Sequence, residues 1–339
     1  MLCIKNKYST KRPLYIGNQY PLRLNVVLGI SNESQDIFPL IDDAIEIVEH
    51  GADCIQDVSI CGKINEFKKR LVSEVAAPCG SVLAYEFAYN VDKYKLSKLM
   101  DIRDLLLDLV TKDAEMGMDF LTLHSSLSLK LLSMQFDNRI IYMGSRGSSL
   151  LYKMMNRLNI DNPLHLYYED IIEVMKKYNM AVSLGSAFRS CSILDYSYKS
   201  MNEELAIQSE LSTIAHAQDL PVLLEGISHI PISKLLEYVT LVNEKCPGVE
   251  VTALGPSPTD VGVGIDHIAG AIAAERAAES GFTLLTIVTG KEHYSLPSRE
   301  DVLEALNAYK LAVYISNLHK GYLPIMDKRV SIARNNLEW

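Results

Sequence analysis

Apolar runs of strand length alternate with helix-like runs along almost the whole chain. The runs that we expect to form strands are 23–29, 52–59, 80–86, 119–125, 180–185, 222–224, 249–255 and 282–288. A helix-type pattern follows each of them, most clearly over 102–118, where apolar residues recur at helical spacing. Eight such units over about 300 residues predict a (β/α)8 barrel of the TIM type, with a doubly wound open sheet as the alternative.

The eight units leave little of the chain outside the barrel. We expect the barrel domain over 23–321, after an N-terminal segment, 1–22, and before a short polar tail, 322–339. A further strand is expected over 139–144, in an irregular interval. Polar side chains recur just past the strand ends, which favours a barrel because its strand ends surround one cavity. These residues are Asp57, Glu86, His124, Arg189, Glu225 and His293.

Two histidines are candidate metal ligands. A strand that ends at Leu224 is followed by Glu225 and His229, and the last strand is followed by a turn that carries Glu292 and His293. Imidazole nitrogens suit zinc or a similar divalent ion, and two protein ligands leave room for water or substrate. We therefore expect His229 and His293 to converge on one metal ion, with structural histidines as the alternative. Glu225 is the candidate catalytic group for proton transfer, and its alternative is a strand-end salt bridge.

The run Gly144–Ser149 predicts an anion site at the start of a helix. Its glycines permit close approach, Arg146 offers a guanidinium, and N–H groups at a helix start favour phosphate. Arg189 is placed to reach the same anion, and the alternatives are an ordinary capped loop and a surface arginine. His124 and Tyr85 are expected at strand ends, where each is either a ligand contact or a buried side chain with its hydrogen bonds satisfied.

The composition limits the classes of partner. Apolar residues make up 48% and charged residues 22% of the chain, as is ordinary for a globular protein. No apolar run approaches the roughly 18 residues of a membrane span, and the first residues lack a signal-peptide core, so we expect a cytoplasmic protein with no membrane partner. A formal charge of -9 argues against nucleic acid as a partner. Six cysteines, none in a Cys-x-x-Cys pair, predict reduced thiols.

Several short motifs, in the same order along the chain, resemble those of one known family. Glu225–Pro231, E-G-I-S-H-I-P, resembles that family's E-G-P-G-H-V-P, and Lys291–Pro297, K-E-H-Y-S-L-P, resembles its K-E-H-L-G-L-P. The supporting pieces are Gly51–Asp53, Ser145–Gly147, Leu254–Pro256, Thr259–Asp260 and Asp266–His267. From about Tyr15 to Trp339, the chain is thus similar to phosphomethylpyrimidine synthase (ThiC) and to its relative that makes 5-hydroxybenzimidazole.

The resemblance implies a (β/α)8 barrel lyase of thiamine-type or cobamide-type cofactor biosynthesis. The family rearranges 5-aminoimidazole ribotide, a small phosphorylated substrate, by radical chemistry that uses S-adenosylmethionine and a 4Fe-4S cluster. The resemblance also implies a second metal, usually zinc, on His229 and His293, and a homodimer. The substrate-binding positions that carry over are Asn25, Tyr85, His124, Ser145, Arg146, Gly147, Arg189 and Glu225.

The departures from the family pattern concern the cluster and the pocket. The family's Cys-x-x-Cys-x4-Cys motif does not occur in these 339 residues, so we expect this chain alone not to hold the cluster. Ser186, Thr252, Gln56 and Val27 stand where the family has aspartate, tyrosine, methionine and asparagine. Three hypotheses follow. They are a metal enzyme with changed chemistry, the family reaction with its cluster supplied by another chain or lost by truncation, and a non-catalytic ligand-binding barrel.

Overall fold

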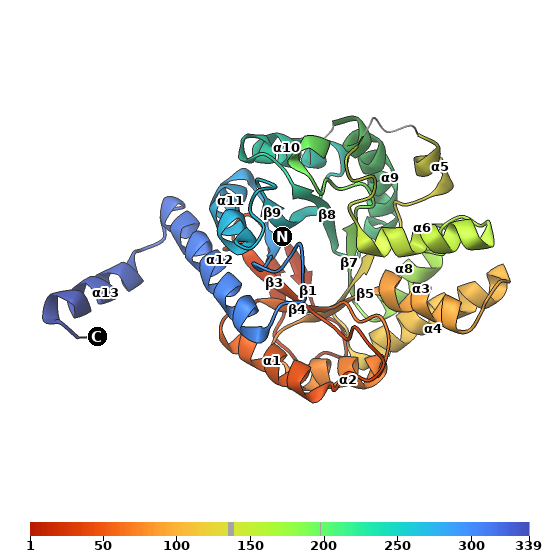
Figure 1. The fold of residues 1–339 in the computed structure, drawn as a ribbon, viewed down its shortest axis with the longest axis horizontal. Helices are drawn as coiled ribbons and strands as arrows, with labels where there is room; N and C mark the ends of the chain where they lie inside the picture. The colour runs from red at the N-terminus through yellow and green to blue at the C-terminus, as the bar shows by residue number, and fades with distance from the viewer. Residues whose placement is uncertain (135–138, 197, 339) are drawn as a thin grey trace.

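Eight parallel strands close into a barrel at the centre of the molecule (Figure 1). The structure, a computed structural model, describes residues 1–134, 139–196 and 198–338. In chain order the barrel strands are β3 (Arg23–Leu28), β4 (Cys54–Asp57), β5 (Cys79–Val82), β6 (Phe120–Leu123), β7 (Ala181–Gly185), β8 (Val222–His229), β9 (Glu250–Ser257) and β10 (Leu284–Thr286). Each strand pairs with the next, and β10 pairs with β3 to close the ring. The predicted (β/α)8 barrel is confirmed.

Helices surround the strands, as Figure 1 shows. The long ones are α1 (Phe38–Glu49), α2 (Ile64–Glu74), α3 (Leu83–Lys93), α4 (Leu99–Met116), α6 (Arg146–Leu158), α8 (Tyr168–Lys177), α9 (Tyr198–His216), α10 (Leu235–Lys245), α11 (Asp266–Ser280), α12 (Arg299–His319) and α13 (Ile325–Asn336). Short turns of helix are α5 (Leu129–Ser133), α7 (Pro163–Leu166), η1 (Ile193–Asp195) and η2 (Ile232–Lys234). No helix in the described ranges is both long and apolar enough to cross a membrane.

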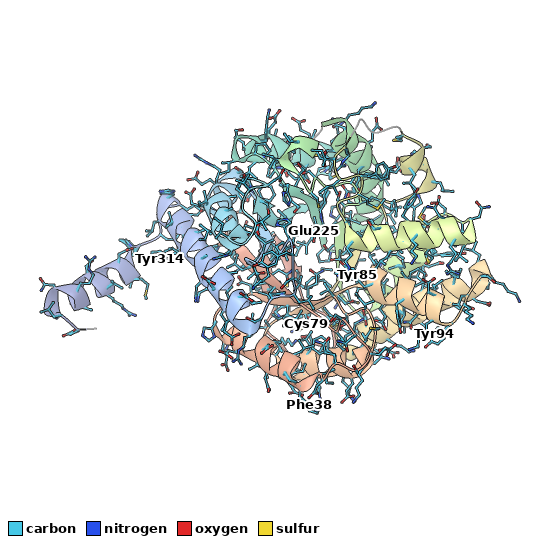
Figure 2. All side chains as sticks on the ribbon, viewed as in Figure 1. Phe38, Cys79, Tyr85, Tyr94, Glu225 and Tyr314 are labelled. Atoms are coloured by element: carbon cyan, nitrogen blue, oxygen red, sulfur yellow. The ribbon has the colours of Figure 1, made fainter. Side chains whose placement is uncertain are left out.

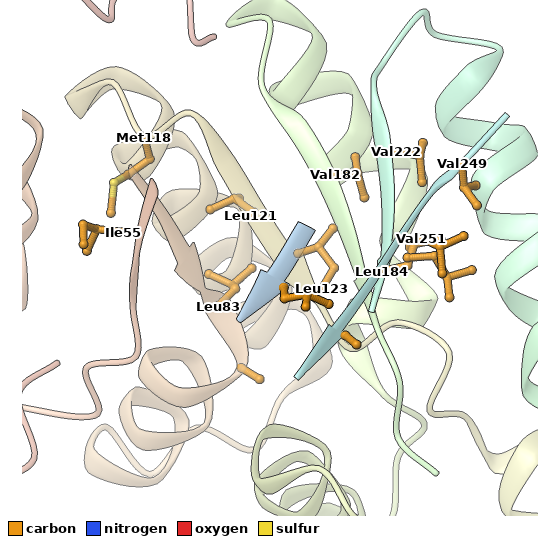
Figure 3. Packing of buried hydrophobic residues seen from close by; sticks show 14 of the residues in the cluster. Ile55, Leu83, Met118, Leu121, Leu123, Val182, Leu184, Val222, Val249 and Val251 are labelled. Atoms are coloured by element: carbon orange, nitrogen blue, oxygen red, sulfur yellow. The ribbon is translucent and has the colours of Figure 1, made fainter. Parts of the chain in front are cut away.

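The main hydrophobic core lies between the outer face of the barrel and the helices. Successive side chains of a strand point to opposite faces, so every second residue faces outward. Figure 3 shows such outward residues, with Leu121 and Leu123 of β6 beside Val182 and Leu184 of β7. Buried apolar side chains of this kind stabilise the fold by about 1.5–3 kcal/mol each.

A small hairpin closes the amino end of the barrel. It consists of β1 (Leu2–Ile4) and β2 (Leu14–Ile16), which pair antiparallel. Its apolar residues form a separate buried cluster with inward-facing residues near the strand starts, which are Cys54, Phe120, Ala181, Leu223 and Leu284. In Figure 1 the N-terminus and β1 lie over the centre of the barrel. The carboxyl ends of the strands therefore form the open mouth of the barrel, the end where active sites of this fold lie.

Three sequence predictions about secondary structure differ from the structure. The strand expected over 80–86 ends at Val82, and α3 begins at Leu83, because apolar residues at four-residue spacing continue into the helix. Residues 139–144 form no strand, only bends and coil. The strand expected over 222–224 continues as far as His229.

The segment expected to be a polar tail contains the helix α13. It projects away from the barrel beyond the end of α12 (Figure 1), and none of its residues is buried. Tyr314 of α12 donates a hydrogen bond to Asp327 at 2.5 Å, which links the two helices. An exposed helix of this length gains little stability from packing within the described chain.

Asp57 and Glu86 do not line the barrel mouth, contrary to the sequence prediction. Asp57 lies on the outward face of β4, because its neighbour Gln56 faces the barrel interior, and Glu86 belongs to α3. Both carboxylates meet Lys68 of α2, whose Nζ lies 2.7 Å from Glu86, 2.8 Å from Asp113 of α4 and 3.9 Å from Asp57. This buried charge cluster links α2, α3 and α4 to the outward face of β4.

Candidate active site at the carboxyl ends of the strands

The imidazoles of His229 and His293 meet at the barrel mouth. His229 is the last residue of β8 and is 4% exposed, whereas His293 lies in the turn after β10 with 31% of its side chain exposed. Their Nε2 atoms are 3.1 Å apart, and the ring centroids are 5.1 Å apart. Two nitrogens bound to one tetrahedral zinc ion, with bonds of about 2 Å, lie about 3.3 Å apart. The two rings therefore have the separation that a shared ion requires.

Each histidine is held through its other ring nitrogen by a carboxylate. His229 Nδ1 lies 2.7 Å from Asp260 Oδ1, and His293 Nδ1 lies 3.0 Å from Asp266 Oδ1. An ionised carboxylate only accepts hydrogen bonds, so both Nδ1 atoms carry the proton in the neutral rings. Both Nε2 lone pairs then point at the same small space. Opposed lone pairs need a cation or a proton between them, so these residues fit a divalent metal ion.

The protonation state of His229 suits metal binding. Burial lowers the pKa of His229 below its usual value, and the neighbouring His293 acts in the same direction, so the ring is neutral near pH 7. Although burial raises the pKa of Asp260, hydrogen bonds from Ser192 and His229 outweigh it and hold that pKa below its usual value. Neutral imidazole backed by an ionised carboxylate is the common form of a histidine metal ligand.

Arg189 and Glu225 form an ion pair beside the histidines. Arg189 follows β7 and Glu225 lies within β8; the guanidinium Nη1 donates to Oε1 of the carboxylate, and both side chains are largely buried. Burial lowers the pKa of Arg189, but Glu225 more than offsets this and raises it. The guanidinium is therefore a permanent positive charge inside the mouth. In Figure 2, Tyr85 and Glu225 both lie over the central part of the barrel.

His124 occupies a narrow slot between two glycines. A β-carbon added at Gly147 would lie 2.8 Å from the His124 ring, and one added at Gly185 would lie 3.0 Å from it. Burial lowers the pKa of His124 to about 3, and Arg189 acts in the same direction, so the ring stays neutral. Its Nδ1 has no hydrogen-bond partner among the described residues. A buried polar atom without a partner is costly, so Nδ1 is available for a ligand group.

The start of α6 lies at the same mouth. Ser145 is the N-cap, and its hydroxyl accepts a hydrogen bond from the Ser148 amide at 3.2 Å. Arg146 is exposed, and its guanidinium lies 5.9 Å from the centre of the Tyr85 ring. Burial raises the pKa of the Tyr85 hydroxyl, whereas Arg189 and Arg146 lower it. The hydroxyl is therefore a neutral donor between two cations.

A pocket of about 220 Å³ lies beside this cluster at the mouth. Its apolar walls include Val27, Leu28 and Ile30, from the end of β3 and the loop that follows. Arg146 and Glu292 supply polar groups to its lining. A small ligand with an apolar ring and a charged group fits such a lining.

Asn25 lies among polar side chains of neighbouring strands inside the barrel. It is 2% exposed inside the barrel, and its Nδ2 donates to Gln56 at 3.0 Å and to Thr286 at 2.9 Å. Gln56 in turn donates to Thr122 at 2.6 Å. These residues form a polar floor under the mouth, and Asn25 has its amide satisfied by protein.

The cysteines do not fit an iron-sulfur cluster. Among the described residues, the metal-binding side chains that come together in groups of three are Glu275, Glu279 and His319, with no cysteine among them. Cys54 and Cys79 lie on neighbouring strands, but the first belongs to the cluster inside the barrel and the second to the core outside it. Three thiolates at one point are what a cluster needs.

Sequence reasoning missed the partners of the two histidines. In the sequence, Asp260 and Asp266 stand out only as parts of two short family-like motifs, and they lie 31 and 27 residues from the rings that they hold. The available signal was their position around a glycine-containing loop, with Asp260 before it and Asp266 at the first residue of α11. Glu204 of α9, which binds the loop after β7, carried no motif at all.

Comparisons with known proteins show the family to which this chain is related. The model of the radical SAM ThiC family matches residues 1–339. Phosphomethylpyrimidine synthase of Geobacter metallireducens is 32% identical over 343 residues, which cover 100% of this chain and 79% of that protein. The enzyme of the same name from Thermotoga neapolitana is 32% identical, over 99% of this chain and 80% of that protein.

Solved structures with a similar fold are more distant in sequence. Dihydropteroate synthase of Xanthomonas albilineans with 4-aminobenzoic acid is 12% identical, with a TM-score of 0.53, over 94% of this chain and 100% of that chain. The Yersinia pestis enzyme of the same name is also 12% identical, with a TM-score of 0.53, over 94% and 99% of the two chains. These likenesses show the TIM-type fold alone. By the family model and the curated relatives together, the chain belongs to the radical SAM ThiC family.

Proposed function

We propose that this chain is the substrate- and metal-binding barrel of a phosphomethylpyrimidine-synthase-type enzyme. It acts as a carbon–carbon lyase on a phosphorylated imidazole ribotide, or a similar small molecule, in thiamine-type or cobamide-type cofactor biosynthesis. Family membership supports the enzyme class. The observation that carries the proposal is the pair of Nε2 lone pairs of His229 and His293, which face each other 3.1 Å apart.

His229 and His293 would hold zinc or another divalent ion. Such an ion supplies Lewis-acid chemistry, because it draws electron density from a substrate amine, carboxylate or hydroxyl group. Asp260 and Asp266 keep the two rings in the tautomer that binds the ion and raise the basicity of the ligand nitrogens.

The start of α6 and Arg189 would hold the phosphate. Backbone N–H groups at Arg146 and Gly147 belong to the first turn of α6, where the helix dipole favours an anion. Arg189 adds a charged donor, which phosphate would share with Glu225 or take from it. The Glu225 carboxylate is then free to move a proton to or from the substrate.

Two neutral side chains would orient the rest of the substrate. His124 presents a ring nitrogen that lacks a partner, and its slot between Gly147 and Gly185 fixes the ring plane. Tyr85 offers its hydroxyl from the first turn of α3. Because the described cysteines form no cluster site, we assign the residues of this chain only to binding, orientation and proton transfer.

Metal analysis of the purified protein, together with a thermal-shift screen of imidazole and pyrimidine phosphates, tests the proposal. Stoichiometric zinc that His229→Ala removes, and a melting temperature that a phosphorylated imidazole ligand raises, are expected. A protein that binds neither zinc nor any phosphorylated ligand would contradict the proposal.

Turnover assays separate the three hypotheses from one another. Product formed only after a cluster-bearing chain and S-adenosylmethionine are added identifies the family reaction with its cluster supplied elsewhere. Product formed from the ligand and metal alone identifies changed chemistry. Tight ligand binding with no product under either condition identifies a non-catalytic barrel.

A further inference from the structure

A buried carboxylate outside the mouth organises the loop that follows β7. Glu204 lies on α9 and is 3% exposed. Its Oε1 accepts hydrogen bonds from the Ser126 hydroxyl at 2.6 Å and the Ala187 amide at 2.5 Å. Its Oε2 accepts from the Phe188 amide at 3.0 Å and from the Ser186 hydroxyl. Three of these four donors belong to residues 186–193, which we call the β7 loop.

The β7 loop carries Arg189, the charged group of the proposed phosphate site, which we call the anion end. Arg189 follows directly after the two amides that Glu204 holds, and it pairs with Glu225. Arg139 reinforces the same stretch, because its guanidinium donates to the Phe188 carbonyl at 2.6 Å and to the Arg189 carbonyl at 3.0 Å. The backbone on both sides of Arg189 is therefore fixed from outside the mouth.

The same loop then reaches the metal end. Ser190 exchanges two hydrogen bonds with the backbone of His229, as its carbonyl accepts from the His229 amide at 3.0 Å and its hydroxyl donates to the His229 carbonyl. Ser192 donates to Asp260 Oδ2 at 2.7 Å. Asp260 Oδ1 is the atom that holds His229 Nδ1 at 2.7 Å. One short loop thus contacts both ends of the site.

The chemistry of the Glu204 pocket indicates a dedicated anchor. A buried carboxylate is costly unless its lone pairs are filled, and here two backbone amides and two hydroxyl groups fill them. An apolar residue in its place would leave the Ala187 and Phe188 amides without these acceptors. The carboxylate therefore sets the direction in which both amides of the β7 loop point.

We propose that Glu204 is a positioning residue for the site. Its carboxylate fixes the β7 loop. The loop in turn holds Arg189, at the anion end, at a fixed position relative to the Asp260–His229 pair at the metal end. This inference rests on the proposed function, because it concerns the same metal and phosphate groups. It adds that both ends depend on one residue that touches neither ligand.

Glu204→Gln is the first test, with Ser212→Ala as the matched control. Glutamine keeps the shape but replaces one oxygen by an NH2 group, which cannot accept from the facing donors. Ser212 is a buried residue of the same helix whose hydroxyl donates to the Ser209 carbonyl. In Glu204→Gln, we expect the affinities for zinc and for inorganic phosphate both to fall roughly tenfold. We expect hydrogen–deuterium exchange over 186–195 to rise. The control should match the wild type in zinc affinity, phosphate affinity and exchange of this segment.

The outcomes separate positioning from mere stability. A lower melting temperature with unchanged zinc affinity, phosphate affinity and loop exchange below that temperature would overturn the inference. Should Glu204→Gln fail to fold, Ser186→Ala removes one loop contact with Glu204 and carries the same expectations on a smaller scale. If the wild type binds neither zinc nor phosphate, the proposed function fails, while the exchange of 186–195 still tests the anchor.

Discussion

His229 and His293 are 64 residues apart in the chain, yet their Nε2 atoms lie 3.1 Å apart. Each ring is held from behind by its own aspartate, Asp260 or Asp266. Neither imidazole has to turn to present its lone pair, so an ion would find the site already organised. The pair should therefore act as one unit that the loss of either ring disables.

His229→Ala and His293→Ala are each expected to abolish tight zinc binding. Asp260→Asn is expected to weaken it roughly 10- to 100-fold, because an amide oxygen supports the Nδ1 proton less well than a carboxylate does. Competition with a zinc-binding dye measures all three affinities. The matched control is Glu304→Gln, which alters a carboxylate that is 69% exposed and lies 3.6 Å from His267. Zinc binding by His293→Ala as tight as that of the wild type would refute the site.

Arg189→Met and Glu225→Gln are expected to change phosphate binding in opposite directions. The first variant loses the buried guanidinium, so the affinity for inorganic phosphate should fall roughly tenfold or more. The second leaves Arg189 without its competing carboxylate, so phosphate should bind more tightly even as turnover falls. Calorimetry measures the affinities, and Arg299→Met, in an exposed ion pair with Glu46, is the control. A lower affinity for phosphate in both variants would mean that the ion pair only stabilises the fold.

The barrel could be predicted from the sequence because each β/α unit leaves a local pattern of apolar residues. The histidine pair could be predicted because short motifs surround each ring. The boundary between β5 and α3 could not, since apolar residues run from Val82 through Leu83 into the helix with no polar break. The alternation of inward and outward side chains is also a weak signal in β5, because that strand is only four residues long.

The direction of a side chain was the second thing that the sequence left open. Asp57 stands at the end of a strand, as a catalytic residue would, but it faces the helices and Lys68. A shift of one residue along a strand moves a side chain to the other face of the sheet. The partners Asp260 and Asp266 were missed for another reason, because hydrogen bonds between distant segments leave no periodic signal.

Gly147→Ala is expected to impair ligand binding while leaving the fold intact. The new β-carbon would lie 2.8 Å from the His124 ring, which would have to move from its slot. The phosphorylated ligand found by the thermal-shift screen should then raise the melting temperature less than in the wild type. Ser149→Ala, at an exposed position in the same first turn of α6 whose hydroxyl donates to the Ser145 carbonyl, should bind that ligand normally. An unchanged ligand response in Gly147→Ala would exclude His124 from the site.

Lys68→Met is expected to destabilise the fold by about 3–5 kcal/mol. It leaves the buried carboxylates of Glu86 and Asp113 facing each other without the ammonium that lies 2.7 and 2.8 Å from them. Urea denaturation at pH 7 measures the free energy of unfolding. Lys112→Met breaks an exposed pair with Asp108 on α4 and should cost only about 0.3–0.5 kcal/mol. Similar losses in both variants would contradict the role of the buried cluster.

Asp57 should make the stability depend on pH between about pH 4 and pH 6. Burial raises the pKa of its carboxyl from 3.8 to about 6, although Lys68 and hydrogen bonds from Ser59 oppose the shift. The folded state therefore binds this proton more tightly than the unfolded state does, so the contribution is present at low pH. It is lost as the pH rises toward 6, and at ~1.4 kcal/mol per pH unit the loss is about 3 kcal/mol.

Asp57→Asn isolates this contribution, because the amide imitates the protonated carboxyl at every pH. The free energy of unfolding of the variant, minus that of the wild type, should increase by about 3 kcal/mol between pH 4 and pH 7. Urea denaturation at several pH values measures the difference, which cancels the titration of groups that both proteins share. Asp104→Asn, at a side chain that is 67% exposed, is the control. A constant difference for Asp57→Asn would show that burial does not raise the pKa of the Asp57 carboxyl.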